Sequence, residues 1–173
     1  MSQARPLTPK SSPYITVEGY RKLERELKDL WVRRADVTLH LSAAAAEGDR
    51  SENAEYIYRK KELREIDRRI RYLQKRLPTL KLVDRLPENN QKVFFGAWIT
   101  LERQDGKQSR YRIVGADETD ARAGLISIDS PMSRALLKKE IHEEVRVKTP
   151  TGETLLTITE ISYSSPNLIH ENF

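Results

Sequence analysis

The chain has 173 residues, of which 38% are hydrophobic and 33% charged, with a net charge of +5 and no cysteine. Without cysteine there are no disulfides or thiolate metal sites, and no apolar run reaches the roughly 18 residues of a membrane span. There is also no signal-peptide segment, so we expect a cytoplasmic protein with a small core. Its basic charge favours an acidic partner such as a nucleic acid, the alternative being a merely solvated surface.

The first 50 residues predict a disordered extension followed by a long helix. Residues 1–13 are rich in proline and serine, which is typical of disorder. Thr16 is the expected N-cap of the helix. Apolar residues then recur at alternating spacings of three and four, the seam of a coiled coil, with Arg34 as an interruption. The seam residues are Tyr20, Leu23, Leu27, Leu30, Val37, Leu41 and Ala44.

The same spacing returns after residue 55 and predicts a second helix. Arg59 interrupts this seam, and Pro78 ends the helix because proline cannot continue the hydrogen-bond ladder. Two seams joined by a short turn bury each other only by folding back antiparallel. Residues 14–78 are therefore predicted to form a coiled-coil hairpin about 40 Å long, with its tip at residues 48–56. The second seam consists of Tyr56, Leu63, Ile66, Ile70, Leu73 and Leu77.

The pattern changes to short strands after a linker at residues 79–92. Ser130 is an expected N-cap with Pro131 at the first helical position, which predicts one helix through Lys139. Residues 93–163 are thus expected to form a small antiparallel sheet with one helix, and residues 164–173 an irregular tail. The whole chain is predicted to be an α+β protein. Strands are predicted at 93–101, 111–114, 125–128, 144–148 and 155–161, with turns at Asp105-Gly106 and Thr151-Gly152.

The predicted tip, GDRSENAEY, has two interpretations. Residues 47–55 have a net charge of −3, whereas residues 56–76 have a net charge of +6. Asp49 and Glu52 have the spacing of a capping box, in which both side chains bond backbone N–H groups at a helix start. Alternatively, the two carboxylates are presented to a hard cation such as Mg²⁺, which takes oxygen ligands and often only one or two from the protein. They would hold that ion only with further ligands from a partner.

The basic residues after the tip are a candidate phosphate-binding surface. Pairing with nearby carboxylates would make them an ordinary solvated face, but an excess of +6 leaves most of them unpaired and favours phosphate contact. Tyr56 lies on the seam and is expected to pack, whereas Tyr58 lies off it and could stack on a base. The RNA-binding candidates are Tyr58, Arg59, Lys60, Lys61, Arg64, Arg68, Arg69 and Arg71.

The sequence contains no signature of a self-sufficient enzyme. There is no glycine-rich phosphate loop and no motif of a catalytic triad. His40, His142 and His170 lie far apart without metal-ligand spacing, so we interpret them as ordinary surface residues.

Several long motifs, in order along the chain, resemble the Gre family of transcript cleavage factors, and most of all its GreB branch. The resemblance extends from about Tyr14 to Tyr163. It implies a C-terminal domain of FKBP-like fold that holds bacterial RNA polymerase at the rim of its secondary channel. It also implies that the hairpin enters this channel when the polymerase has backtracked. The motifs are GDRSENAEY, KKELREIDRRIRYL, KVFFGAWITLE, RYRIVGADE and ISIDSPMSRALLKKE.

The resemblance also implies roles for individual residues. Asp49 and Glu52 would help the polymerase's own aspartates hold a second Mg²⁺ and orient the attacking water, so the chain would be a non-enzymatic cofactor of RNA hydrolysis. Ser51, Asn53 and Glu55 are second-tier candidates for shaping the tip. The basic residues would hold the 3′ segment of the nascent RNA. Polymerase-binding candidates are Ser130, Pro131, Met132, Arg134, Leu136 and Leu137.

Two alternative functions stay open. A channel-binding inhibitor of the same architecture would occupy the polymerase without promoting cleavage, although the intact Asp49 and Glu52 argue against that class. A nucleic-acid-binding coiled coil would need no polymerase at all. In the leading hypothesis the protein is a monomer that binds no membrane.

Overall fold

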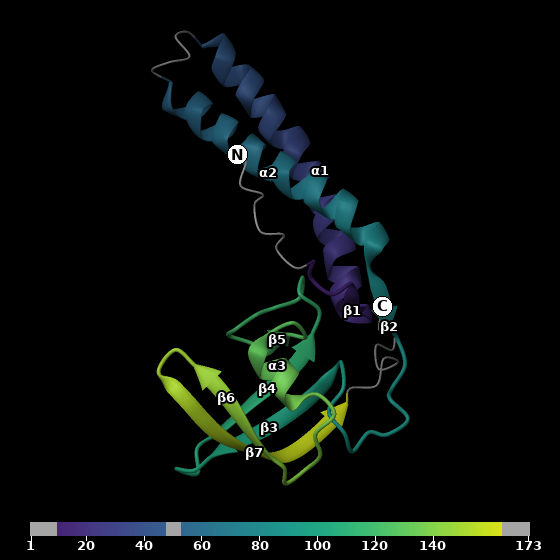
Figure 1. Cartoon of the computed structure of the whole chain (residues 1–173). Helices are drawn as coiled ribbons and strands as arrows, with labels where there is room; N and C mark the ends of the chain where they lie inside the picture. Colours follow the sequence, from purple (N-terminus) through teal and green to yellow (C-terminus); the bar gives the residue numbers. More distant parts are fainter. Residues whose placement is uncertain (1–9, 48–52, 164–173) are drawn as a thin grey trace, which may run out of the picture. The chain divides into compact units, whose positions relative to one another are not determined.

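The computed structural model describes residues 10–47 and 53–163 of a chain that divides into two compact units (Figure 1). One unit is the stretch from Tyr20 to Leu80, and the other combines the chain before Tyr20 with the chain from Lys81 onward. A helical unit and a sheet unit confirm the predicted α+β class. In the described ranges, no helix has the length and apolar character to cross a membrane.

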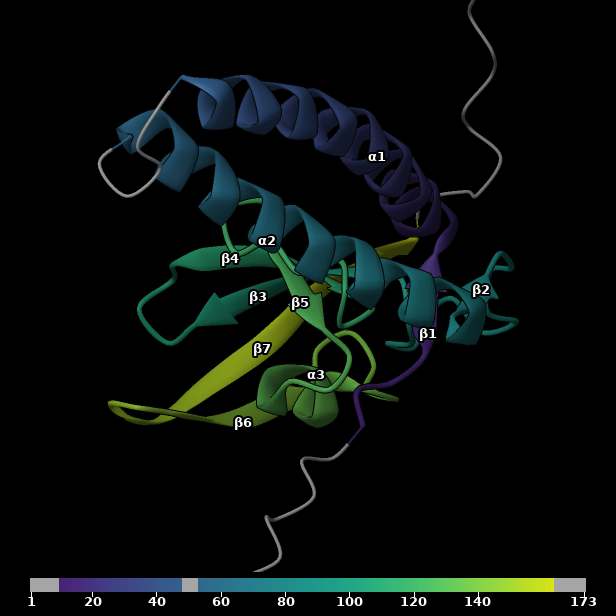
Figure 2. The same ribbon diagram turned by 90° about the horizontal axis from the view of Figure 1, so that it is seen from above.

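Two long helices form the hairpin and lie side by side in both views (Figures 1 and 2). α1 extends over Val17–Ala46 and α2 over Ala54–Arg76, followed by the 3-10 turn η1 at Leu77–Thr79. Pro78 lies in this turn, in keeping with its predicted effect on the helix. The predicted cap of α1 is confirmed, because Thr16 Oγ1 accepts the N–H of Gly19 at 3.0 Å.

The predicted seams are the buried faces of the hairpin. Val37 of α1 and Ile66 and Ile70 of α2 form its core. The spacing of three and four therefore identified the residues that the two helices bury against each other. Half-buried residues packed around this core are Leu27, Leu30 and Leu63.

Among the described residues, ion pairs join α1 to α2. Arg34, the charged interruption of the first seam, has its Nε 2.7 Å from Asp67 Oδ1. Partly exposed ion pairs contribute about 0–1 kcal/mol each, so their main effect is to fix which residues of the two helices face each other. Two further pairs are Arg33 with Glu62 and Arg69 with Glu26.

A five-stranded sheet in the order β5-β4-β3-β7-β6 is the centre of the second unit. All neighbouring strands are antiparallel except β4 and β5, which are parallel. The prediction of an antiparallel sheet is wrong at this edge, because residues 115–124 carry the chain back beside Arg112 of β4 before β5 begins in the same direction. The strands are β3 (Ala97–Arg103), β4 (Gln108–Val114), β5 (Leu125–Ser127), β6 (Glu144–Thr149) and β7 (Gly152–Tyr163).

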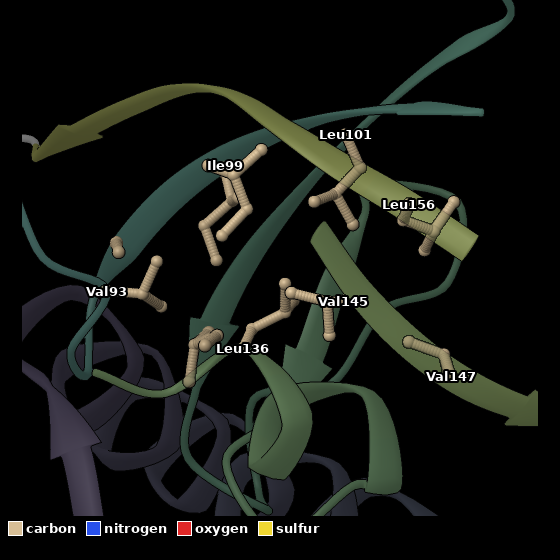
Figure 3. Close-up of a cluster of buried hydrophobic side chains, with 10 residues drawn as sticks. Val93, Ile99, Leu101, Leu136, Val145, Val147 and Leu156 are labelled. Atoms are coloured by element: carbon tan, nitrogen blue, oxygen red, sulfur yellow. The ribbon is translucent and has the colours of Figure 1, made fainter. Parts of the chain in front are cut away.

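One short helix, α3 (Pro131–Leu136), contributes to the core of the sheet unit (Figure 3). Ser130 caps it as predicted, with its Oγ accepting the N–H of Ser133 at 3.1 Å. The helix was predicted to continue through Lys139, but it ends at Leu136, because Leu137 leaves the helical region with ψ 135° and Lys138 then has a left-handed backbone with φ +68°. The buried core residues include Val93, Ile99, Leu101, Leu136, Val145, Val147 and Leu156.

A pair of short strands ties the N-terminal segment to the sheet unit. β1 (Tyr14–Thr16) pairs in parallel with β2 (Lys81–Val83). The predicted linker at 79–92 therefore contains a strand. The expected disorder of residues 1–13 is wrong at Ser12, whose N–H donates to Asp129 Oδ2 at 2.8 Å. The rest of that expectation, at residues 1–9, and the predicted tail at 164–173 lie outside the described residues.

The carboxylate of Glu118 anchors the start of α1 within the sheet unit. Its Oε2 accepts the N–H of Thr16 at 3.0 Å and the N–H of Gly115 at 2.7 Å. Its Oε1 accepts the hydroxyl of the same threonine. A side chain on Gly115 has no room, because its Cβ would lie 2.2 Å from the carbonyl oxygen of Tyr14. Glycine at this position lets β1 approach the loop after β4.

Candidate functional site at the hairpin tip and the basic face of α2

Asn53 closes the base of the acidic turn. It is the N-cap of α2, with φ −81° and ψ 102°, and its Oδ1 accepts the N–H of Tyr56 at 3.1 Å. Its Nδ2 donates to the carbonyl oxygen of Ala44, near the end of α1, at 3.0 Å. The capping-box interpretation, in which Asp49 would be the N-cap of the second helix, is therefore wrong, because Asn53 is that N-cap. Asp49, Ser51 and Glu52 lie outside the described residues.

Glu55 and Arg59 belong to an ion-pair network just behind the tip. Arg59 Nε lies 2.7 Å from Glu55 Oε1, and its second partner is Glu62, which in turn pairs with Arg33 of α1. The hydrogen bond that Arg59 donates to Glu55 raises the pKa of the Arg59 guanidinium. Only 19% of the Arg59 side chain is exposed. Arg59 was predicted to bind RNA, but two carboxylates already engage its guanidinium.

Arg69 is also paired rather than available. Its Nε and Nη2 donate to the two carboxylate oxygens of Glu26 at 2.6 and 2.9 Å. Its guanidinium also lies 5.3 Å from the ring centre of Tyr72. A two-point contact with a carboxylate on the other helix fixes Arg69 as a contact between α1 and α2.

An exposed stripe of cations follows one face of α2. Its members are separated by three, four, three and four residues, so they share one side of the helix, opposite the buried seam. Within residues 10–47 and 53–163, no ion pair engages any of them. The prediction of unpaired cations is therefore confirmed for this stripe, but Lys75 was not among the predicted residues although the same spacing extends to it. We call these five residues the cationic stripe: Lys61, Arg64, Arg68, Arg71 and Lys75.

The two tyrosines beside the tip differ in exposure, as predicted. Tyr58 is 60% exposed, and the guanidinium of Arg59 lies 5.7 Å from its ring centre. Tyr56 is half-buried, with the ammonium group of Lys60 at 5.7 Å from its ring. Tyr58 therefore presents an open aromatic face beside the cations, an arrangement on which a nucleic-acid base can stack.

The candidate polymerase-binding segment around α3 is only partly exposed. Pro131 and Arg134 are exposed, whereas Met132 and Leu137 are half-buried and pack against the core. Leu136 is 0% exposed and belongs to that core. Its prediction as a contact residue is wrong, because the helix turns this side chain into the sheet unit.

The described part of the chain provides no metal site by itself. Residues 10–47 and 53–163 contain no cluster of three or more histidine, aspartate or glutamate side chains that could hold a metal ion. The two candidate ligands, Asp49 and Glu52, lie in the turn outside these ranges.

RNA binding by variants can test whether only the cations without an ion pair contact RNA. The double substitution Lys61→Ala/Arg64→Ala should weaken crosslinking to a labelled single-stranded RNA and reduce the salt slope of binding by about 1.4, at about 0.7 per phosphate contact. Arg69→Ala is the matched control, and it should leave the slope unchanged while lowering the melting temperature of the hairpin. An equal loss of slope in both variants would mean that pairing with Glu26 does not remove Arg69 from RNA contact.

Similarity to known proteins extends these observations. A family model described as "Transcription elongation factor, N-terminal" matches residues 13–82, and one described as "Transcription elongation factor, GreA/GreB, C-term" matches residues 88–163. The chain is 57% identical over 164 residues to Transcription elongation factor GreB of Pseudomonas aeruginosa, covering 94% of this chain and 98% of the relative. It is 55% identical over 167 residues to the GreB of Xanthomonas axonopodis pv. citri, covering 95% and 99%.

A helical hairpin with an acidic tip, joined to a sheet unit, is thus the architecture of a transcription elongation factor. The crystal structure of GreA factor homolog 1 (Gfh1) of Thermus thermophilus aligns with a TM-score of 0.40 at 22% identity, over 86% of this chain and 97% of that one. The family assignment rests on the sequence matches. The chain belongs to the GreA/GreB family of transcription elongation factors, and the two relatives described above carry the name GreB.

Proposed function

We propose that this chain enters the secondary channel of bacterial RNA polymerase, tip first, and stimulates the polymerase to hydrolyse backtracked RNA. The observation that supports the proposal most directly is that one hairpin carries both an acidic segment and a row of exposed cations. The sequence that connects α1 to α2 is acidic, and five cations that form no ion pair among the described residues follow one face of α2 after it. A narrow hairpin suits a channel, and the cations suit the phosphates of a displaced RNA strand. Membership of the GreA/GreB family supports the same partner.

Asp49 and Glu52 are proposed to supply oxygen ligands at the tip. Two carboxylates leave most positions around Mg²⁺ to ligands from the polymerase and the RNA phosphate. Such an ion, when bound, activates a water and stabilises the leaving oxygen of the phosphodiester. The task of this chain is to hold the two carboxylates in place, which makes it a cofactor of the polymerase rather than a nuclease.

The RNA-binding part of the proposal follows the distribution of paired and unpaired charge. The cationic stripe, with Lys60 and the exposed ring of Tyr58, is assigned to the 3′ segment of the nascent RNA. Arg59 and Arg69 are assigned to the hairpin itself, because carboxylates already engage both. A single copy carries the tip and the stripe, so the chain is proposed to act as a monomer, in the cytoplasm with the polymerase.

The test is a cleavage assay on stalled, backtracked polymerase complexes with labelled transcript and Mg²⁺. Addition of the chain should shorten the transcript from its 3′ end and leave a complex that resumes elongation. No shortening, together with slowed elongation, would identify an inhibitor that only occupies the channel. Shortening of free RNA without polymerase would make the chain a nuclease, and binding to free RNA alone would identify a polymerase-independent coiled coil.

A further inference from the structure

The side chain of Asn53 uses both ends of its amide to join the two helices. The oxygen accepts the N–H of Tyr56 in the first turn of α2 at 3.1 Å. The nitrogen donates to the carbonyl oxygen of Ala44 in the last turn of α1 at 3.0 Å. Among the described residues, the N–H of Glu47 also donates to that carbonyl, at 3.3 Å. One side chain therefore hydrogen-bonds to backbone groups in the end turns of both helices, where such groups lack part of their intrahelical partners.

These contacts link the two ends of the connection between α1 and α2. Asn53 and Ala44 are nine positions apart, and Asp49 and Glu52 lie between them in the sequence. The carbonyl oxygen of Asn53 also accepts the N–H of Ile57 at 3.1 Å, a backbone hydrogen bond at the start of α2. The last turn of α1 is thus linked to the first turn of α2 by hydrogen bonds that involve neither carboxylate.

We propose that Asn53 is a positioning residue, whose amide bridge sets where the tip carboxylates stand when the hairpin reaches the polymerase. The inference rests on the proposed function, because it needs Asp49 and Glu52 to act there. Catalytic groups must be held close to the productive geometry, and a displacement of about 1 Å costs on the order of 10²-fold in rate. The bridge at the base of the turn restricts such displacements before the polymerase is met.

The chemistry of the position requires asparagine. Aspartate and serine both cap a helix by accepting the N–H of the third residue. Aspartate has no donor for the carbonyl of Ala44, and the serine hydroxyl is too short to span both partners. The orientation of the amide follows from its partners, because a backbone N–H needs an acceptor and a carbonyl needs a donor.

Substitutions that keep the N-cap but remove the bond to Ala44 can distinguish a positioning role of Asn53 from a capping role. Asn53→Ser and Asn53→Asp each keep the N-cap and lose the bridge, the first without adding charge, whereas Asn53→Ala loses both. If Asn53 only capped α2, serine would support cleavage like asparagine, and only alanine would fail. If the bridge positions the carboxylates, serine and aspartate should be as defective as alanine.

The experiment uses the full chain with backtracked polymerase complexes and measures cleavage rate against factor concentration. For Asn53→Ser we expect a maximal rate lowered about 10²-fold, with an unchanged half-saturating concentration and unchanged helical circular dichroism. Asn89→Ser is the matched control, since it makes the same change at an exposed asparagine of the sheet unit, and it should cleave like the unmodified chain.

A wild-type maximal rate for Asn53→Ser would overturn the inference. So would a loss of helical signal in both the serine and the aspartate variants, because Asn53 would then be needed for folding. Failure of the unmodified chain to promote any cleavage is a different outcome, which would remove the proposed function itself. A raised half-saturating concentration at an unchanged maximal rate would assign Asn53 to polymerase binding and would also overturn it.

Discussion

Asp49→Ala/Glu52→Ala should reduce transcript cleavage by at least about 100-fold and leave polymerase binding intact. Each substitution removes an oxygen ligand from the acidic turn without touching the seams or the cross-helix ion pairs. The loss of a single preorganised group that stabilises developing charge typically costs about 10²–10³-fold. Cleavage rate at saturating factor measures the effect, and competition against labelled unmodified factor measures binding.

The same variant should behave as a competitor of the unmodified factor, because it keeps the stripe and the sheet unit. Glu24→Ala/Glu65→Ala is the control, since it removes two exposed carboxylates from the hairpin away from the turn and should cleave normally. Cleavage that persists in Asp49→Ala/Glu52→Ala would remove these two residues from the proposed metal site.

Gly115→Ala should destabilise the sheet unit by about 2–4 kcal/mol, because backbone atoms block the new methyl group. The Cβ would lie 2.2 Å from the carbonyl oxygen of Tyr14 and 2.9 Å from Glu118 Oε2. The first atom belongs to β1, so the strand must move, and the hydrogen bonds of Thr16 to Glu118 break with it. In a Trp31→Phe background, the fluorescence of Trp98 follows unfolding of this unit alone.

Gly106→Ala provides the comparison. This glycine has a left-handed backbone with φ +78° and no atom within 4 Å of its Cβ position, so alanine there suffers only conformational strain, about 1–2 kcal/mol. If Gly115→Ala costs no more than Gly106→Ala, then β1 can separate from the loop after β4 without loss, and the anchor at Glu118 is not a stabilising contact.

The parts of the fold that follow from local patterns were predictable. A seam repeats every 3.5 residues whatever its partner, so Val37 and Ile70 could be assigned to the interior from spacing alone. The caps at Thr16 and Ser130 also follow from neighbouring residues. The family resemblance then supplied the partner, which composition and spacing had left open.

What could not be predicted depends on contacts between distant residues. Net charge counts Arg69 and Arg68 alike, but only the alignment of α1 with α2 brings Glu26 to Arg69. The pairing of β1 with β2 joins segments more than 60 residues apart by only three residues each, too short for a strand pattern. Asn53 was a candidate for shaping the tip, but its bond to Ala44 depends on where α1 ends.

The cationic stripe gives the factor a length scale. At about 1.5 Å per residue, α2 separates Lys61 from Lys75 by about 21 Å. If RNA follows these cations, the length of α2 sets how many nucleotides of the RNA 3′ segment the hairpin can hold. The tip carboxylates would then set only the position of cleavage. Adding or removing a heptad on both helices would preserve the seam and change the length of α2 by about 10 Å. The length of RNA that the hairpin holds would thus depend on the length of α2 and not on the carboxylates at the tip.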